Sequence, residues 1–253
     1  MSEWALITGA STGIGRELAR CFAADRFNLV LVARNQGRLE ELADELHEQH
    51  GITAKVLARN LAQPGAPQDL FESLRDTPVS VLVNNAAIGV YGPFAEGELG
   101  AQTNVMQLNM RALVELTHLF VQPMLARQSG RILNVASFAA FQPGPTVNIY
   151  YASKAFVHSF SYALAMELEG TGVTVTALCP GTTRTEFFGR AGMRLPGGWF
   201  TMDARTVAEI GYRGLMRGKR VVIPGLMNKL AAALARRGPV CVAAEAVRKI
   251  HAQ

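Results

Sequence analysis

The chain has 253 residues, of which 49% are hydrophobic and 18% charged, and its formal net charge is +5. This composition is that of an ordinary globular protein and excludes an intrinsically disordered chain, and the length favours one α/β domain over two small ones. Three widely separated cysteines, Cys21, Cys179 and Cys241, argue against a disulfide framework or a zinc site and predict a reducing compartment without a bound metal.

Short β-rich stretches alternate along the chain with longer amphipathic stretches. Runs of aliphatic and β-branched residues predict strands at residues 4–8, 28–33, 54–58, 80–83, 131–135, 173–178 and 220–223. Apolar residues at helical spacing predict helices at residues 14–24, 36–49 and 103–127, and another helix that contains Tyr150. This alternation predicts a single doubly wound, Rossmann-type α/β domain, with a parallel sheet of about seven strands and helices on both faces. Ligands of such folds bind beyond the carboxyl ends of the strands.

The N-terminus enters a predicted strand at Trp4, which leaves no room for a signal peptide. The sequence also contains no run of about 18 uncharged apolar residues, the length that a membrane-spanning helix needs. We therefore expect a cytoplasmic protein without a membrane span.

The first predicted strand runs into a glycine-rich turn, Thr8-Gly9-Ala10-Ser11-Thr12-Gly13-Ile14-Gly15. Gly9 permits a turn that a Cβ atom would obstruct, and Gly13 would let the backbone approach a pyrophosphate. Gly15 would let the helix pack closely on the sheet. Hydroxyl and N–H groups near a helix N-terminus attract anions. We therefore expect a dinucleotide to bind at Gly9, Ser11, Thr12, Gly13, Ile14 and Gly15.

The second predicted strand ends in Ala33-Arg34-Asn35. An acidic residue at this place in a dinucleotide-binding fold binds the ribose 2′-hydroxyl, whereas an arginine accommodates a 2′-phosphate. No acid is present, and the Arg34 guanidinium matches a phosphate bidentately. The sequence therefore favours NADP(H) over NAD(H), although Arg34 as a plain solvated charge is the alternative.

Tyr150 and Lys154 are four residues apart, so on a helix they lie on the same face. A phenol has an ordinary pKa near 10. A neighbouring cation favours the phenolate, so we expect Lys154 to lower the pKa of Tyr150 and to suit it to acid–base catalysis. Tyr151 competes for this role, but its side chain leaves the helix about 100° away from that of Tyr150.

The chain resembles the one-domain short-chain dehydrogenases/reductases over about residues 4–225, and the bacterial branch with a C-terminal extension most of all. The resemblance rests on motifs in a fixed order: Thr8-Gly9-x-x-x-Gly13-Ile14-Gly15, Asn84-Asn85-Ala86, Asn109, Ser137, Tyr150-x-x-x-Lys154 and Pro180-Gly181-Thr182-Thr183-Arg184-Thr185.

The resemblance implies a catalytic role for four of these residues. Ser137, thirteen positions before Tyr150, would hydrogen-bond the substrate carbonyl, and Tyr150 would protonate its oxygen. Lys154 would hold the nicotinamide ribose and lower the Tyr150 pKa. Asn109 would support a water that links Lys154 to solvent.

The same resemblance implies further cofactor contacts. In the family, the segment that begins at Pro180-Gly181 holds the nicotinamide carboxamide. Besides the glycine turn, Arg34, Tyr150 and Lys154, the implied cofactor-binding residues are Asn60, Leu61, Asn85, Ala86, Pro180, Gly181, Thr183 and Thr185. Two positions depart from the family pattern: Ala87 stands where glycine is usual, and Asn60 stands where aspartate is usual.

Apolar residues predict the substrate wall and, with it, a bulky apolar ketone or an acyl-type carbonyl as the substrate. The expected wall comprises Ile88, Tyr91, Phe94, Phe138, Phe141 and the stretch 187–202. Glycines among these apolar residues predict a lid over about residues 186–203. The resemblance further implies a homodimer or homotetramer, with the predicted helix 103–127 and the Tyr150 helix in the dimer contact.

Residues 211–253 hold nine lysines and arginines and one acid, Glu245. We expect residues 1–225 to form the dinucleotide-binding catalytic domain, and residues 226–253 to form a basic helical C-terminal extension packed on it. The extension either covers the mouth of the active site, which we favour, or makes a weak contact with a membrane surface. Nucleic acid is the least favoured partner, because no aromatic residue follows Tyr212.

The sequence as a whole predicts an NADP(H)-dependent oxidoreductase that transfers a hydride between nicotinamide and a carbonyl or secondary alcohol, with Tyr150 as general acid and base. The alternatives are a non-catalytic NADP(H)-binding regulator and a peripheral membrane protein bound through its basic tail.

Overall fold

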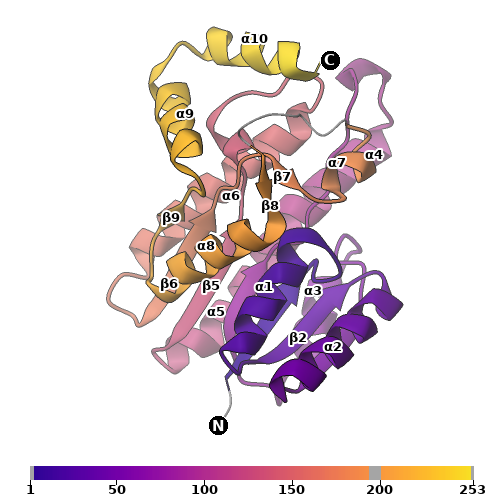
Figure 1. The fold of residues 1–253 in the computed structure, drawn as a ribbon, viewed down its shortest axis with the longest axis vertical. Helices are drawn as coiled ribbons and strands as arrows, with labels where there is room; N and C mark the ends of the chain where they lie inside the picture. The colour runs from indigo at the N-terminus through magenta and orange to yellow at the C-terminus, as the bar shows by residue number, and fades with distance from the viewer. Residues whose placement is uncertain (1–2, 194–200, 252–253) are drawn as a thin grey trace.

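The computed structural model describes residues 3–193 and 201–251. Its main sheet is parallel and has seven strands in the order β3-β2-β1-β4-β5-β6-β9 (Figure 1). The strands are β1 (Trp4–Thr8), β2 (Asn28–Ala33), β3 (Ala54–Ala58), β4 (Val79–Asn84), β5 (Gly130–Val135), β6 (Val173–Leu178) and β9 (Val221–Val222). Each predicted strand overlaps one of these, and the predicted doubly wound α/β fold is confirmed. The strand order reverses between β1 and β4, which is where such folds bind their ligands.

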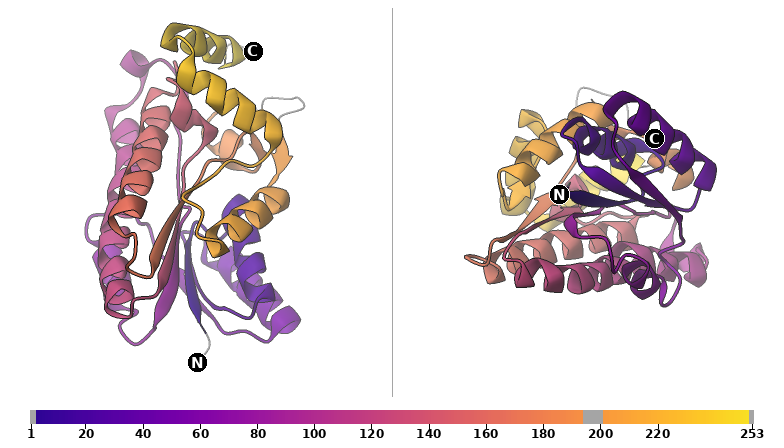
Figure 2. Two further views of the ribbon diagram at one scale, coloured as in Figure 1. Left: turned by 90° about the vertical axis from the view of Figure 1, so that its left-hand side faces the viewer. Right: turned by 90° about the horizontal axis from the view of Figure 1, so that it is seen from below.

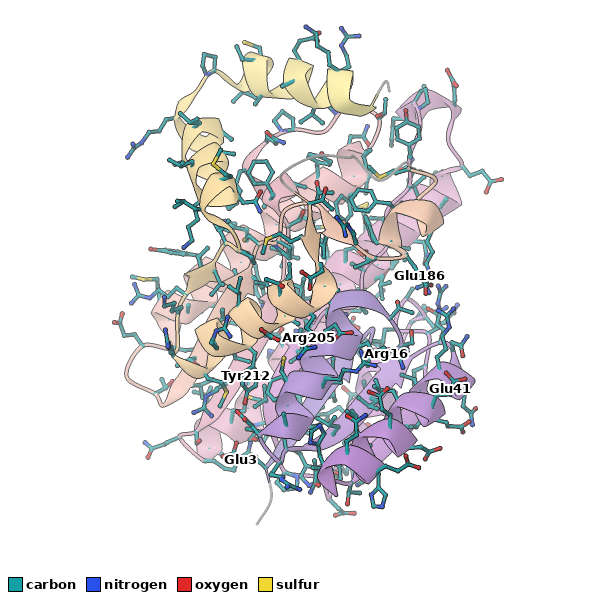
Figure 3. The ribbon with its side chains drawn as sticks, in the orientation of Figure 1. Glu3, Arg16, Glu41, Glu186, Arg205 and Tyr212 are labelled. Carbon is teal, nitrogen blue, oxygen red and sulfur yellow. The ribbon has the colours of Figure 1, made fainter. Side chains whose placement is uncertain are left out.

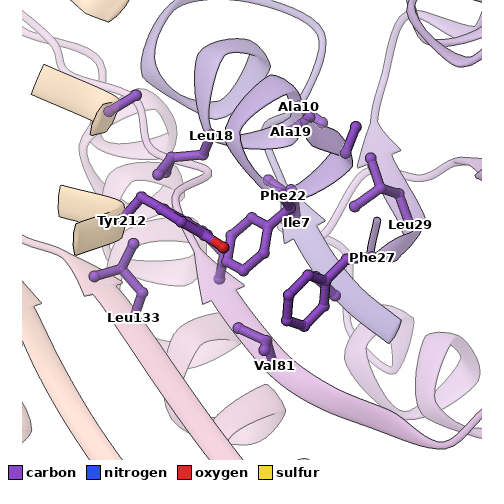
Figure 4. Packing of buried hydrophobic residues seen from close by; sticks show 14 of the residues in the cluster. Ile7, Ala10, Leu18, Ala19, Phe22, Phe27, Leu29, Val81, Leu133 and Tyr212 are labelled. Carbon is purple, nitrogen blue, oxygen red and sulfur yellow. The ribbon is translucent and has the colours of Figure 1, made fainter. Parts of the chain in front are cut away.

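Helices cover both faces of the sheet (Figure 2). Successive side chains of a buried strand point to opposite faces, and here both sets are apolar, so both faces need a cover. One layer contains α1 (Gly13–Ala24), α2 (Gln36–His50) and α8 (Ala204–Met216). The other contains α3 (Ala66–Glu72), α5 (Leu113–Ala126) and α6 (Asn148–Glu167). In the first layer, the Phe22 ring packs edge-to-face on Phe27 at 5.3 Å and on Tyr212 at 4.8 Å (Figure 4). The contact with Tyr212 joins the C-terminal part of α1 to α8.

The predicted long helix over residues 103–127 is present, but it begins earlier, at Leu99, and contains a π-helical segment that was not predicted. The structure has α4 (Leu99–Met106), a π-helical segment η2 (Gln107–Ala112) and then α5. A π-helical turn accommodates an extra residue and is often found at functional sites. Here it contains the buried Asn109.

Shorter elements lie beyond the carboxyl ends of the strands. These are η1 (Phe94–Glu96), η3 (Phe138–Phe141), α7 (Phe187–Arg190) and a small parallel pair formed by β7 (Thr183–Arg184) and β8 (Met202–Asp203). The predicted lid therefore includes β8 and α7, whereas its residues 194–200 lie outside the described residues.

Two helices follow the sheet, α9 (Leu226–Arg237) and α10 (Val240–His251), and Gly238 and Pro239 separate them. They lie at the end of the molecule opposite the N-terminus (Figures 1 and 2). Within residues 3–193 and 201–251, no helix is long and apolar enough to cross a membrane.

Candidate active site

A cavity of about 1660 Å³ lies beyond the carboxyl ends of the central strands. It is larger than a typical pocket for one small ligand, so it has room for a dinucleotide and a substrate together. Its described lining contains the cationic side chains Arg34, Arg59, Lys154 and Arg190 and no carboxylate. The cavity therefore suits an anionic ligand.

The glycine turn forms one wall of this cavity. Gly9 and Gly13 have φ values of +67° and +57°, which favour glycine. A Cβ atom on Gly15 would lie 2.3 Å from the carbonyl oxygen of Gly9, so Gly15 permits the close packing that the sequence predicted. The Asn85 amide donates hydrogen bonds to the carbonyl oxygens of Thr8 (2.9 Å) and Gly9 (3.1 Å). Asn85 thus fixes the shape of the turn while it also lines the cavity.

Helix α1 begins at Gly13, next to this wall, and Thr12 makes no side-chain capping bond to it within the described structure. The first N–H groups of a helix carry partial positive charge and need acceptors. Ser11, Thr12, Gly13 and Ile14 line the cavity beside them. This end of the cavity can therefore hold a phosphate.

Arg34 and Asn60, two of the predicted cofactor-binding residues, follow the ends of β2 and β3 and line the cavity. Arg59 lines it as well, and the sequence reasoning missed this residue. The sequence could have indicated it, because Arg59 is a second arginine that directly follows a predicted strand. Leu61 and Ala86 also line the cavity.

Tyr150 stands in the first turn of α6, and its hydroxyl forms a hydrogen bond with Ser137. Ser137 directly precedes η3, and its hydroxyl oxygen accepts the backbone N–H of Ala139 at 3.1 Å. Ser137 thus both caps the short helix and contacts Tyr150. The structure brings this predicted pair together.

Lys154 is buried, and its ammonium donates to the carbonyl oxygen of Val135 at 2.7 Å. The ammonium nitrogen lies 5.7 Å from the centre of the Tyr150 ring. Burial lowers the pKa of Lys154 to about 8, since desolvation disfavours the charged form.

The expectation that Lys154 lowers the pKa of Tyr150 is wrong for this structure. Burial raises the pKa of Tyr150 to about 12, and the hydrogen bond with Ser137 offsets only part of that rise. Desolvation outweighs the hydrogen bond with Ser137, so the Tyr150 phenol is neutral near pH 7.

Asn109 does not line the cavity but joins two parts of its wall. Its side chain accepts the N–H of Ile88 at 3.0 Å, and donates to the Ile88 carbonyl oxygen at 2.9 Å and to the Ser153 hydroxyl at 3.1 Å. Ser153 in turn donates to the carbonyl oxygen of Tyr150 at 2.7 Å. The π-helical segment therefore positions Asn109 to tie the Ile88 loop to the Tyr150 helix. The sequence reasoning missed Ser153.

The segment after β6 lines the cavity through Pro180, Gly181 and Thr183. A Cβ atom on Gly181 would lie 2.6 Å from the side-chain amide nitrogen of Asn228 in α9. Asn228, Ala231 and Val247 also line the cavity, so both C-terminal helices contribute to its wall.

The expected apolar wall is present in part. Ile88, Tyr91 and Phe138 line the cavity, together with Phe187, Phe188 and Met193 of the lid segment. Phe141 instead packs on Phe138 and His158, and Phe94 is 52% exposed. The wall residues Leu195, Trp199 and Phe200 lie outside the described residues.

The residues at the start of α7, Thr185 to Phe187, contact the glycine turn, α2 and Tyr150. The Thr185 methyl carbon lies 2.9 Å from where a Cβ of Gly13 would stand. The Glu186 carboxylate pairs with Arg38 of α2 at 2.9 Å and with Arg190 at 2.6 Å, on the side of the molecule that faces α2 (Figure 3). The Phe187 ring lies 5.0 Å from the Tyr150 ring. Thr185, one of the predicted cofactor-binding residues, also lines the cavity.

Comparisons with known proteins place these features in a family. The family described as short chain dehydrogenase matches residues 3–194. A very-long-chain 3-oxoacyl-CoA reductase of Phaeosphaeria nodorum is 40% identical over 178 residues, which cover 68% of this chain and 52% of that protein. The chain therefore spans about half the length of this relative.

Two solved structures resemble the whole fold. A short-chain dehydrogenase from Sphingobium yanoikuyae in complex with NADPH has a TM-score of 0.85 and 33% identity, and the match covers 91% of this chain and 93% of that one. The bulky-bulky ketone specific alcohol dehydrogenase from Comamonas testosteroni has a TM-score of 0.81 and 32% identity, with 91% of both chains covered.

The family match includes the glycine turn, Asn109, Ser137, Tyr150 and Lys154, and it covers more than half of the chain. The chain belongs to the short-chain dehydrogenase/reductase family of oxidoreductases.

Proposed function

We propose that this protein is an NADP(H)-dependent reductase of bulky apolar ketones or acyl-type carbonyls. One observation carries the proposal: Ser137, Tyr150 and Lys154 meet at one end of a cavity whose other end is cationic and free of carboxylates in its described lining. Gly9 and Gly13 have left-handed φ values, and Asn85 and Thr185 lie against the positions where Cβ atoms of these glycines would stand, so the turn packs closely along the cavity wall. These features fit a nicotinamide dinucleotide phosphate.

When bound, a nicotinamide supplies or accepts the hydride. Ser137 would hydrogen-bond the carbonyl oxygen of the substrate, and Tyr150 would donate its phenolic proton to that oxygen. A pKa of about 12 keeps this proton on Tyr150 at neutral pH, as carbonyl reduction requires. In the reverse direction, the same phenol would have to lose its proton first. Lys154 would hold the ribose with its ammonium, and Asn109 would position the Tyr150 helix through Ser153.

The apolar wall supports a substrate whose carbonyl carries a bulky apolar group. Arg190 lines the cavity next to the apolar wall, but its charge is already paired with Glu186. A small anionic substrate would leave Ile88, Phe138 and Phe187 in contact with water. The two related proteins described as acting on very-long-chain 3-oxoacyl-CoA and on bulky ketones support the same class.

The test of this function is NADPH oxidation with a graded set of carbonyl compounds. We expect kcat/KM to be highest for bulky aryl–alkyl or long-chain ketones and lowest for a small 2-oxo acid. Tight NADPH binding without turnover of any carbonyl would instead support a non-catalytic NADP(H)-binding regulator. The hydrogen bond between Ser137 and Tyr150 argues against that alternative, since a regulator has no need of a proton donor.

We expect Arg34→Glu to weaken NADPH binding by about ten- to a hundredfold and to leave NADH binding nearly unchanged. The reason is that a charge-assisted hydrogen bond to a 2′-phosphate is lost and a repulsive charge replaces it. Fluorescence titration of both cofactors measures the two Kd values. Arg75→Glu, which makes the same charge change at an exposed residue outside the cavity lining, should have no effect. An unchanged ratio of NADPH to NADH affinity in Arg34→Glu would refute the preference for NADP(H).

We also propose that the lid segment orders over the substrate. Thr185, Glu186 and Phe187 connect it to the glycine turn, to Arg38 and to Tyr150. NADPH and a ketone together should therefore slow hydrogen exchange in peptides from residues 186–193, while peptides from β4 serve as an unchanged reference. Equal exchange with and without both ligands would contradict the lid.

We further propose that the protein forms a homodimer or homotetramer and that its C-terminal helices belong to the catalytic unit. The exposed Met106 in α4, and Tyr162 and Met166 in α6, support a homodimer or homotetramer with these helices in the contact. Residues 226–253 would work as one unit with residues 1–225, because Asn228, Ala231 and Val247 line the cavity.

A further inference from the structure

The two C-terminal helices expose a row of large apolar side chains, which we call the α9–α10 surface. It comprises Leu226, Met227, Leu230 and Leu234 of α9, and Val240 and Val242 of α10, which are 52% to 73% exposed. Leu226, Leu230 and Leu234 are spaced four residues apart and so lie on one face of α9. The opposite face already packs on the protein through Asn228 and Ala232, which are 7% and 1% exposed. Folding of this chain therefore does not account for the three leucines.

The charges on these helices are almost all positive. Helix α9 contains no acidic residue, and its Lys229 and Arg237 are exposed. Helix α10 adds the exposed Arg248 and Lys249, both within 4 Å of its single acid, Glu245. The two helices thus expose large apolar side chains together with lysines and arginines.

We propose that the α9–α10 surface docks on an anionic lipid bilayer, with its leucines at the boundary between headgroups and acyl chains. Apolar residues beside lysine and arginine are what interfacial helices use, and anionic lipid attracts such cations. A second copy of the chain is a poorer occupant. A two-fold contact would bring the cations of two identical surfaces together, and α9 has no acidic residue to pair with them.

The position of these helices connects the surface to the cavity. Asn228 and Ala231 of α9 and Val247 of α10 line the cavity from within, whereas the leucines point away from it. Docking would bring the cavity wall to the lipid surface, where apolar compounds accumulate. Only this last consequence depends on the proposed function, because lipid binding is measured without turnover.

Cosedimentation with vesicles tests the proposal. We expect the full chain to bind vesicles of phosphatidylcholine with phosphatidylglycerol, to bind pure phosphatidylcholine far less, and to dissociate at high salt. The triple variant Leu226→Gln, Leu230→Gln, Leu234→Gln should bind at least about tenfold more weakly, because buried leucines contribute strongly to such affinities. Lys229→Glu with Arg237→Glu should also lose about tenfold or more.

A matched control makes the same charge change elsewhere. Arg217→Glu with Lys219→Glu alters two exposed cations just before β9, outside α9 and α10. This variant should bind vesicles like the wild type. Thermal unfolding and NADPH binding show whether the leucine variant folds.

Three results would overturn the proposal. The first is wild-type protein that does not bind the anionic vesicles. The second is a folded leucine variant that binds them as tightly as the wild type. The third is a leucine variant that light scattering finds in a smaller assembly, because a second copy of the chain would then cover the surface.

Discussion

Replacing Tyr150 by phenylalanine should lower turnover of a good ketone by roughly a hundred- to ten-thousandfold, the usual contribution of a general acid. The substitution removes the only proton that Tyr150 can donate and keeps the ring that packs against Phe187 at 5.0 Å. NADPH affinity should stay nearly unchanged, since the glycine turn, Arg34 and Lys154 are intact. Stopped-flow NADPH oxidation and fluorescence titration measure the two effects separately.

Tyr151→Phe is the matched control for this experiment. Tyr151 also lines the cavity, and its ring packs on Gly144 and lies 6.1 Å from the Tyr150 ring. Loss of its hydroxyl should change turnover little. Full activity of Tyr150→Phe, or a larger loss in Tyr151→Phe, would show that the proton donor is assigned to the wrong tyrosine.

Replacing Lys154 by methionine should lower turnover by about a hundredfold or more, because misplacement of the ribose by even 1 Å has an effect of this size. It should also remove a proton uptake that accompanies NADPH binding. In the free protein, burial lowers the pKa of Lys154 to about 8, so the side chain is mostly neutral above that pH. A bound anionic cofactor favours the ammonium and raises this pKa.

The difference between the Lys154 pKa in the free protein and in the NADPH complex determines how NADPH affinity changes with pH. Below pH about 8, Lys154 is protonated with or without NADPH, and no proton is taken up. Between about pH 8 and 10, binding takes up a fraction of a proton, and affinity falls as pH rises, by at most about tenfold per pH unit. Calorimetry in two buffers of different ionisation enthalpy measures the uptake.

Lys55→Met is the control, because Lys55 lies over the Trp4 ring and outside the cavity lining. It should preserve the proton uptake that Lys154→Met abolishes. Equal proton uptake in wild type and Lys154→Met would exclude Lys154 as the titrating group.

The sequence predicted the fold because its strands are buried on both faces and therefore read as apolar runs, such as Asn28–Ala33. It also predicted that the glycine turn, Arg34, Ser137, Tyr150 and Lys154 meet at one site. The glycine turn, Arg34 and Ser137 follow the carboxyl ends of parallel strands β1, β2 and β5, and Tyr150 and Lys154 lie in α6, the helix after β5. Their roles in cofactor binding and catalysis stay predictions.

Other features had no signal in the sequence. The π-helical segment around Asn109 contains no glycine or proline that would mark a break. The Arg38–Glu186 ion pair joins residues 148 positions apart, so only the folded chain shows it. Spacing predicted that Tyr150 and Lys154 share a face, but the direction of the Tyr150 pKa depends on burial, which spacing does not report.

One measurement tests the central claim most directly: a single turnover with NADPH in which both hydrogens on the reactive carbon of the nicotinamide ring are deuterium. With a bulky apolar ketone, the account predicts that deuterium appears at the carbinol carbon of the alcohol, one atom per NADPH oxidised. It further predicts that Tyr150→Phe, saturated with the same cofactor, forms this alcohol roughly a hundred- to ten-thousandfold more slowly. Bound NADPH that yields no deuterated alcohol from any ketone, or equal rates in both proteins, would contradict it.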